Sequence, residues 1–358
     1  MSGSGGSVDA IAVETDSLNA RPTDAIATPD SASNGTPRTL FPGSPALDGL
    51  RTADGSSWPE LRRRLPARWG RLWLDIGLRY LMLALGLALA CAVAARFGNG
   101  FGLVAAPFVA VWMGFWFASI VLFIHEAAHY NLHPDKDKND RLAGNVICVL
   151  IGNDIKHYRA HHWKHHLYLG DTADTEISYH WAPTLRFAIE TMVGVHAWRV
   201  FRAHRNAGLD AFPKASARSR NTLALARGIV LHGAILLPIV LAGWWSAAVA
   251  WALAVLVVFP YLSALRQQLE HRSPDAASDV DYTKVPHGAV NRMFGGDPFA
   301  RAFGCAGFRR HLLHHWDPST SYTRFDELEG FLMQTEVAPL IDGARTTYFA
   351  AWRVLARG

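Results

Sequence analysis

The chain has 358 residues, of which half are hydrophobic and 18% are charged. Soluble domains usually carry about 25% charged residues, so the composition predicts a membrane protein. The net charge of +5 does not indicate nucleic-acid binding, because Lys and Arg flank apolar segments instead of forming a basic stripe with interleaved aromatic residues.

Residues 1 to about 55 are rich in Ser, Gly, Thr, Asp, Ala and Pro and show no sustained apolar period. Such a segment cannot bury enough apolar surface to offset its ordering entropy, so we expect a disordered cytosolic tail. It also lacks the charged start and apolar core of a secretory signal peptide. Residues 56–358 are expected to form one membrane domain.

Two apolar segments follow the tail, at about 73–96 and 101–124. The second has no charged residue and would be about 36 Å long as a helix, which is enough to cross a bilayer. In the first, Asp75 and Arg79 stand four residues apart and can pair at the level of the lipid headgroups. A turn at 96–100 separates the two predicted spans.

The next segment, 130–221, contains many Lys and Arg residues, so the positive-inside rule places it in the cytosol. Residues 228–265 are free of charge and would be about 57 Å long as one helix, which is too long for a single crossing. A turn at 243–246 divides them, and the resulting spans are predicted at about 223–243 and 246–265. An even number of crossings leaves both termini in the cytosol.

Histidines cluster beside these segments, and neutral imidazole is the commonest metal ligand in proteins. The groups are His125-x-x-x-His129, His162-x-x-His165-His166, the isolated His271, and His311-x-x-His314-His315. Spacings of three or four residues place two rings on one face of a helix, and the predicted topology brings all the groups to one membrane face. Ligation by nitrogen alone argues against iron–sulfur clusters but leaves iron, zinc and copper open.

The three cysteines, Cys91, Cys148 and Cys305, are too scattered for a disulfide framework or a zinc site and are interpreted as reduced apolar residues.

His157-x-x-x-His161-His162 is an alternative register of the second histidine group. His133 continues the spacing of the first group, but Pro134 follows it and a helix need not reach it.

Further polar residues have competing explanations. We expect His180, His196, His204 and His287 to be solvated, and His232 to be packed or hydrogen-bonded inside the third span. The acidic residues Asp171, Asp174 and Glu176 either orient ligating imidazoles or form a solvated loop. Gln267 precedes His271 by four residues, so its side chain, or a water that it holds, is a candidate to complete a metal's ligands.

The histidine groups resemble the three histidine boxes, HxxxH, HxxHH and HxxHH, of the membrane fatty acid desaturase family, over about residues 73–325. The segment from His162 to Asp171 also resembles the second box of sphingolipid-type desaturases. The resemblance implies an all-α integral membrane protein with four transmembrane helices and a cytosolic helical cap that holds a di-iron centre. The implied ligands of the two irons are His125, His129, His162, His165, His166, His271, His311, His314 and His315. Gln267 stands where acyl-CoA desaturases have an Asn that holds a water ligand.

The resemblance further implies an O2-dependent oxidoreductase that desaturates a fatty acyl chain, with no catalytic residues beyond the metal ligands. The substrate is expected to enter from the bilayer, which is the plasma or inner membrane if the protein is bacterial. Electrons from NAD(P)H are expected to arrive through a separate ferredoxin or cytochrome b5-like protein and its reductase, because no His-Pro-Gly-Gly haem-binding stretch is present.

Parts of the sequence also match other classes of protein. A di-iron hydroxylase or ketolase begins with the same removal of a hydrogen atom, and the spacing does not separate these reactions. His125-Glu126-Ala-Ala-His129 matches the HExxH motif of zinc proteases, with Glu126 as general base. The Leu47-Asp48-Gly49 sequence that resembles a third-ligand motif lies in the predicted tail. A transporter that uses histidines as a proton relay is a further alternative.

Overall fold

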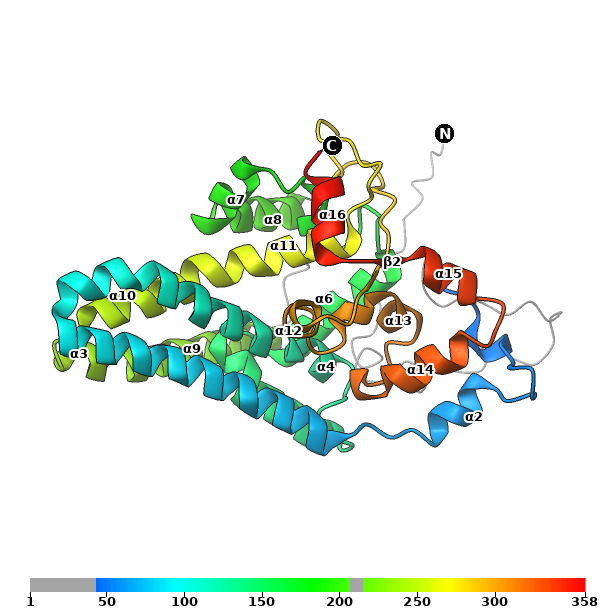
Figure 1. The fold of residues 1–358 in the computed structure, drawn as a ribbon, viewed down its shortest axis with the longest axis horizontal. Coiled ribbons are helices and arrows are strands. Elements are labelled where there is room, and N and C mark those ends of the chain that lie inside the picture. The colour runs from blue at the N-terminus through cyan, green and yellow to red at the C-terminus, as the bar shows by residue number, and fades with distance from the viewer. Residues whose placement is uncertain (1–42, 207–214, 358) are drawn as a thin grey trace, which may run out of the picture. The chain divides into compact units, whose positions relative to one another are not determined.

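The computed structural model describes residues 43–206 and 215–357, which belong to one compact unit, Thr36–Gly358. These residues are mostly helical, as the sequence predicts (Figure 1). The sequence did not indicate the two short strands, β1 (Met293–Phe294) and β2 (Arg345–Thr346), which pair in parallel. Their side chains give no alternating pattern because each strand is two residues long.

The helices comprise a long apolar set and a set of shorter helices. The long set consists of α3 (Trp69–Val121), α9 (Ala215–Leu241), and α10 (Trp245–Leu253), which continues through the π turn η6 (Ala254–Val258) into α11 (Phe259–His271). The shorter helices are α2 (Trp58–Arg63), α4 (Phe123–Ala128), α5 (Lys136–Leu142), α6 (Ile155–Tyr168), α7 (Leu185–Met192), α8 (Val195–Asn206), α12 (Pro298–Phe303), α13 (His311–Trp316), α14 (Phe325–Leu332), α15 (Ala338–Gly343) and α16 (Tyr348–Leu355). Single turns connect them at η2 (Leu47–Gly49), η3 (Ala143–Ile147), η4 (Cys148–Leu150), η5 (Ile177–His180), η7 (Phe308–Arg310) and η8 (Tyr322–Arg324).

Helix α3 is interrupted inside the predicted turn at 96–100. Gly98 has φ 79° and ψ 166°, a conformation that residues with a side chain rarely adopt. The two arms then pack against each other, with the indole nitrogen of Trp112 donating a hydrogen bond to the carbonyl oxygen of Met82 at 2.9 Å. Figure 1 shows α3 turning back on itself beside α10.

Three helical stretches in the described residues are long and apolar enough to cross a membrane: Trp69–Ala128, Arg218–Leu241 and Trp245–His271. The first contains both arms of α3. The last reaches farther than the predicted span 246–265, so His271 lies on the membrane helix itself. Large apolar side chains point outward from these stretches, and Phe108 and Leu241 are 76% and 77% exposed. Such surfaces are stable against lipid rather than against water.

The predicted boundary of the disordered tail at about residue 55 is wrong. Residues 1–42 of that prediction lie outside the described residues, but Leu47 and Leu50 are buried in one apolar cluster with Trp58. Trp58 Nε1 also donates to Asp317 Oδ2 at 2.7 Å. This contact joins residues 259 positions apart, so local composition could not reveal it.

Candidate metal centre

Four elements carry the nine predicted histidines. Helix α4 carries His125, and His129 is the residue that ends it. Helix α6 carries the second group and begins at Asp154, whose carboxylate accepts hydrogen bonds from the amides of Lys156 and His157. The last residue of α11 is His271, and α13 consists almost entirely of the third group.

The structure brings all nine histidines together in two buried groups. The first group contains His125, His129, His162, His166 and His314. The second contains His165, His271, His311 and His315. In each group the candidate ligand atoms all lie within 4.8 Å of one another. His125 and His314, which belong to one group, are about half the chain apart in sequence. Histidines that served only to fill the core would not need to converge in this way.

The ring nitrogens have the spacing expected of neighbouring ligands on one ion. In the first group, His162 Nε2 lies 3.0 Å from His129 Nε2 and 3.1 Å from His166 Nε2. In the second, His271 Nε2 lies 2.8 Å from His311 Nε2 and 3.2 Å from His165 Nε2. Nitrogens about 2.1 Å from a common metal would be separated by about 3 Å. The residues present therefore fit a metal in each group.

Burial makes these imidazoles suitable ligands. Removal from water and the neighbouring imidazoles lower the pKa of His311, His314 and His315 well below the usual value. Their rings are therefore neutral and offer nitrogen lone pairs. Both ring nitrogens of His125 are buried without a hydrogen-bond partner among the described residues. A buried polar group of this kind is costly unless a ligand satisfies it, and a metal ion would do so.

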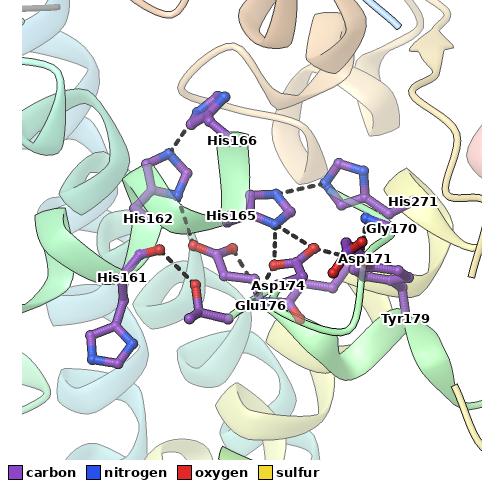
Figure 2. A network of polar contacts seen from close by, with 12 residues as sticks. His161, His162, His165, His166, Gly170, Asp171, Asp174, Glu176, Tyr179 and His271 are labelled. Atoms are coloured by element: carbon purple, nitrogen blue, oxygen red, sulfur yellow. Dashed lines mark hydrogen bonds and ion pairs between the residues drawn. The ribbon is translucent and has the colours of Figure 1, made fainter. Parts of the chain in front are cut away.

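Two carboxylates orient imidazoles by binding Nδ1, the ring nitrogen that points away from the other histidines of the group (Figure 2). His162 Nδ1 donates to Glu176 Oε1 at 2.7 Å, and His165 Nδ1 donates to Asp174 Oδ1 at 2.9 Å. Each bond fixes the tautomer that leaves Nε2 free to bind a metal. Burial alone would raise the pKa of Glu176, but His162 and His165 hold it below its usual value. The prediction that Asp174 and Glu176 orient imidazoles is confirmed.

Other predicted partners lie elsewhere. Asp171 caps its own loop by accepting from Thr172 and Ala173. Gln267 contacts Ser178 and Glu176 rather than a histidine of either group, with its Nε2 3.4 Å from Glu176 Oε2. Asp171 was wrong as a candidate to orient an imidazole, because a spacing in sequence does not determine where a side chain points. The Gln267 side chain makes its hydrogen bonds to Ser178 and Glu176, and a water held by it stays a prediction.

The surplus histidines stay out of both groups. His157 and His161 contact each other with ring centres 4.5 Å apart, and Figure 2 shows the ring of His161 pointing away from the labelled imidazoles. His133 Nδ1 accepts a hydrogen bond from the amide of Asp135. His232 is hydrogen-bonded to Leu150 and Trp251 inside the membrane helices, as predicted.

The prediction of solvated histidines was wrong at three positions. His180, His196 and His287 are 6%, 3% and 5% exposed, and burial lowers the pKa of each, to about 4 for His180 and about 3 for His287. His180 and His287 stack with ring centres 5.5 Å apart. Residues 272–292, which cover this part of the structure, have no regular secondary structure from which burial could be inferred.

Sequence reasoning missed a carboxylate beside the second group. Glu270 is 1% exposed, and its Oε2 lies 3.9 Å from His311 Nε2. Arg266, one turn earlier on α11, is 3.1 Å from Glu270 Oε1. The sequence did offer one signal for Glu270, namely its position directly before His271. A helix end that carries one ligand also brings the neighbouring residues close to the site.

Three buried arginines, also missed, hold the backbone that carries the histidines. Arg159 donates to the carbonyl oxygens of Ala127 and Ala128 at the end of α4. Arg272 donates to the backbone of Tyr179 and His180, and Arg292 donates to that of Leu269. These contacts give additional donors to carbonyl groups near helix ends, where the helix itself supplies fewer donors.

Residues 101–338, more than half of the chain, match the model of the family described as Fatty acid desaturase. The matched segment contains all nine histidines of the two groups. No curated protein matches the chain.

Proposed function

The chain belongs to the fatty acid desaturase family, and on that premise we propose that it introduces a C=C bond into the acyl chain of a lipid. The family makes it an oxidoreductase of the O2-dependent desaturase and hydroxylase type, and the apolar helices make it a membrane protein. The observation that carries the proposal is the pair of buried histidine groups on adjoining helix ends.

Two irons fit the donors best. Five imidazoles in one group and four in the other can hold two ions, whereas a single zinc ion uses about four ligands. When bound, the irons would supply reductive O2 activation and removal of hydrogen from an unactivated C–H bond. The chain's own residues hold the imidazoles in place through Asp174 and Glu176 and exclude water by burial.

The reaction needs an external electron donor. Forming one C=C bond removes two hydrogens from the acyl chain, and together with one O2, two electrons and two protons these give two water molecules. We propose that the electrons originate from NAD(P)H and arrive through a ferredoxin or cytochrome b5-like protein and its reductase. The acyl chain would come from the bilayer that surrounds the apolar helices.

We propose a topology of four spans with both termini and the histidine-bearing cap in the cytosol. The break at Gly98 gives α3 two arms, and with α9 and the α10–α11 helix these make four crossings. In a variant without native cysteines, Lys284→Cys should react with an impermeant thiol reagent from the cytosolic side and Gly100→Cys from the opposite side. Reaction of both from the same side would contradict the four-span arrangement.

Removing a carboxylate that orients an imidazole should weaken metal binding. We expect Asp174→Asn to lower metal affinity by about 10-fold to 100-fold, because the amide no longer fixes the tautomer of His165 as a carboxylate does. Asp171→Asn is the matched control, since the Asp171 carboxylate accepts from Thr172 and Ala173 in its own loop. Metal retained after dialysis against a chelator series measures the effect. Equal losses in both variants would mean that Asp174 does not act through His165.

Incubation of the holoprotein with its reductant, membrane lipids and ¹⁸O2 tests the reaction itself. A desaturase produces an acyl chain two mass units lighter, and the label appears only in water. A hydroxylase or ketolase, the second candidate, places ¹⁸O in the lipid. Unchanged lipids under O2 and a competent donor would count against the whole oxidoreductase proposal.

The zinc protease is disfavoured by the surroundings of Glu126. Its Oε2 accepts a hydrogen bond from Ser321 Oγ at 3.1 Å and lies 3.4 Å from the amide nitrogen of Tyr322. One oxygen of the proposed general base is therefore held by η8 and the residue before it, and the whole side chain is 0% exposed. The protease would also leave four buried imidazoles of the second group unexplained.

A further inference from the structure

A cavity of about 660 Å³ lies beside the metal centre, where the first arm of α3 meets α12, η7 and η8. Its lining includes five arginines and two aspartates. The arginines are Arg71, Arg79, Arg301, Arg309 and Arg310. Its charge is therefore strongly positive, and none of the nine histidines lines it.

The five arginines differ in the partners of their guanidinium groups. Arg301 donates to the carbonyl oxygen of Gly296, and Arg79 Nε is buried without a partner among the described residues. Arg310 is paired with Asp326 and Glu329, and Arg79 with Asp75. In contrast, the guanidinium groups of Arg71 and Arg309 have no hydrogen-bond or ion-pair partner among the described residues.

Arg309 stands next to Arg310 in the chain, and the carboxylates of Asp326 and Glu329 are both paired with Arg310. An anion in the cavity would supply the missing counter-charge, and a guanidinium group binds two oxygens of a phosphate or carboxylate at once.

The same cavity has an apolar side that descends into the membrane. Leu78, Met82 and Trp116 line it, all from the two arms of α3. At 1.5 Å per residue, Met82 lies about 16 Å farther along the helix axis than Arg71. Along α3 the cavity thus runs from Arg71, past the Asp75–Arg79 ion pair, to the apolar side chain of Met82, which matches the charged and the apolar end of a lipid.

One wall of the cavity belongs to the segment that closes the metal centre. Ala306 and Gly307 line the cavity, and the next residue, Phe308, packs against His125 with ring centres 4.4 Å apart. Gly307 has φ 90°, and a side chain there would collide with Tyr322 and Phe325. A ligand in the cavity therefore lies against the layer of residues that separates it from the histidines.

We propose that this cavity binds the anionic headgroup of an acyl lipid, through Arg71 and Arg309, and so selects a substrate with a phosphate or carboxylate group. The identification of the bound lipid as the substrate rests on the proposed function. The binding site itself stands on the cavity, its charge and its apolar side.

Binding of radiolabelled palmitoyl lysophosphatidic acid to the full-length holoprotein in maltoside micelles tests the proposal. We expect saturable binding that weakens about tenfold in Arg71→Gln and about tenfold in Arg309→Gln, since each loses a charge-assisted contact. The matched control is Arg353→Gln, an exposed arginine on α16 that does not line the cavity, which should bind as the wild type does. Asp326→Asn should bind more tightly, because it removes a negative charge from the lining.

Competing ligands identify the chemistry. If palmitate displaces the probe, the site exists and accepts carboxylates. If palmitate does not displace the probe while lysophosphatidic acid still binds, the site exists and is specific for phosphates. Palmitoyl lysophosphatidylcholine, which has no net charge, should compete at least about tenfold less well. Equal competition by this lipid, displacement by inorganic phosphate alone at the same concentration, or unchanged binding in both arginine variants would overturn the proposal.

Failure of this site and failure of the proposed function are distinguishable. If the arginine variants bind lipid normally while the wild type still desaturates, the cavity is not the headgroup site and the reaction stands. If lipid binding depends on Arg71 and Arg309 but the iron-loaded protein forms no double bond, the headgroup site stands and the desaturase proposal fails.

Discussion

His271→Ala is expected to lose the metal of the second group and to reduce turnover at least about 100-fold. The second group has four imidazoles, and His271 Nε2 lies within 3.2 Å of the Nε2 atoms of both His165 and His311. Removal of this ring leaves three imidazole donors in the group and an empty buried space beside them. Metal per chain and product per minute should both be measured, after each variant is shown to accumulate in the membrane.

Two histidines outside the groups provide the controls. His204→Ala and His133→Ala should retain both metals and nearly full turnover, because neither residue belongs to a group of candidate ligands. His315→Ala should resemble His271→Ala, since His315 belongs to the same group. If His271→Ala kept wild-type metal while His204→Ala lost it, the assignment of the two groups as metal sites would be wrong.

Arg159→Leu is expected to destabilise the protein by about 3 kcal/mol or more. Arg159 is 1% exposed, is paired with Asp140 and donates to the carbonyl oxygens of Ala127 and Ala128. Its loss removes the cation paired with the Asp140 carboxylate and one donor from each of two carbonyl groups at the end of the helix that carries His125. We expect the free energy of unfolding in a denaturant titration to fall, and metal retention to fall with it.

A double variant separates the charge from the backbone contacts. Asp140→Asn in the Arg159→Leu background should recover part of the lost stability, because no unpaired carboxylate remains. Arg141→Leu, an exposed neighbour on α5, should change stability by less than about 0.5 kcal/mol. An Arg159→Leu protein as stable as the Arg141→Leu protein would show that this buried pair does not hold α4 in place.

The ligand groups could be anticipated because their signals are local. Spacings such as His162-x-x-His165-His166 fix which rings share a helix face, and charge-free segments locate the membrane helices. The convergence of His125, His271 and His315 followed from the predicted topology together with the resemblance to a family. No local pattern alone would have brought His271 into the set.

The features that the sequence did not reveal depend on distant contacts. Trp58 orders the end of the predicted tail through Asp317, and Arg159 reaches back to the end of α4. Glu270 lies at the second group only because α11 ends beside α13. The burial of His180 and His287 likewise arises from a segment without regular structure, whose path composition does not determine.

Metal analysis of the full-length protein, purified from cells supplied with iron, tests the central claim most directly. Two groups with five and four buried imidazoles predict two iron atoms per chain, with product formation that rises in proportion to iron content. A reproducible single zinc per chain, together with proteolytic activity that disappears in Glu126→Gln, would contradict the account.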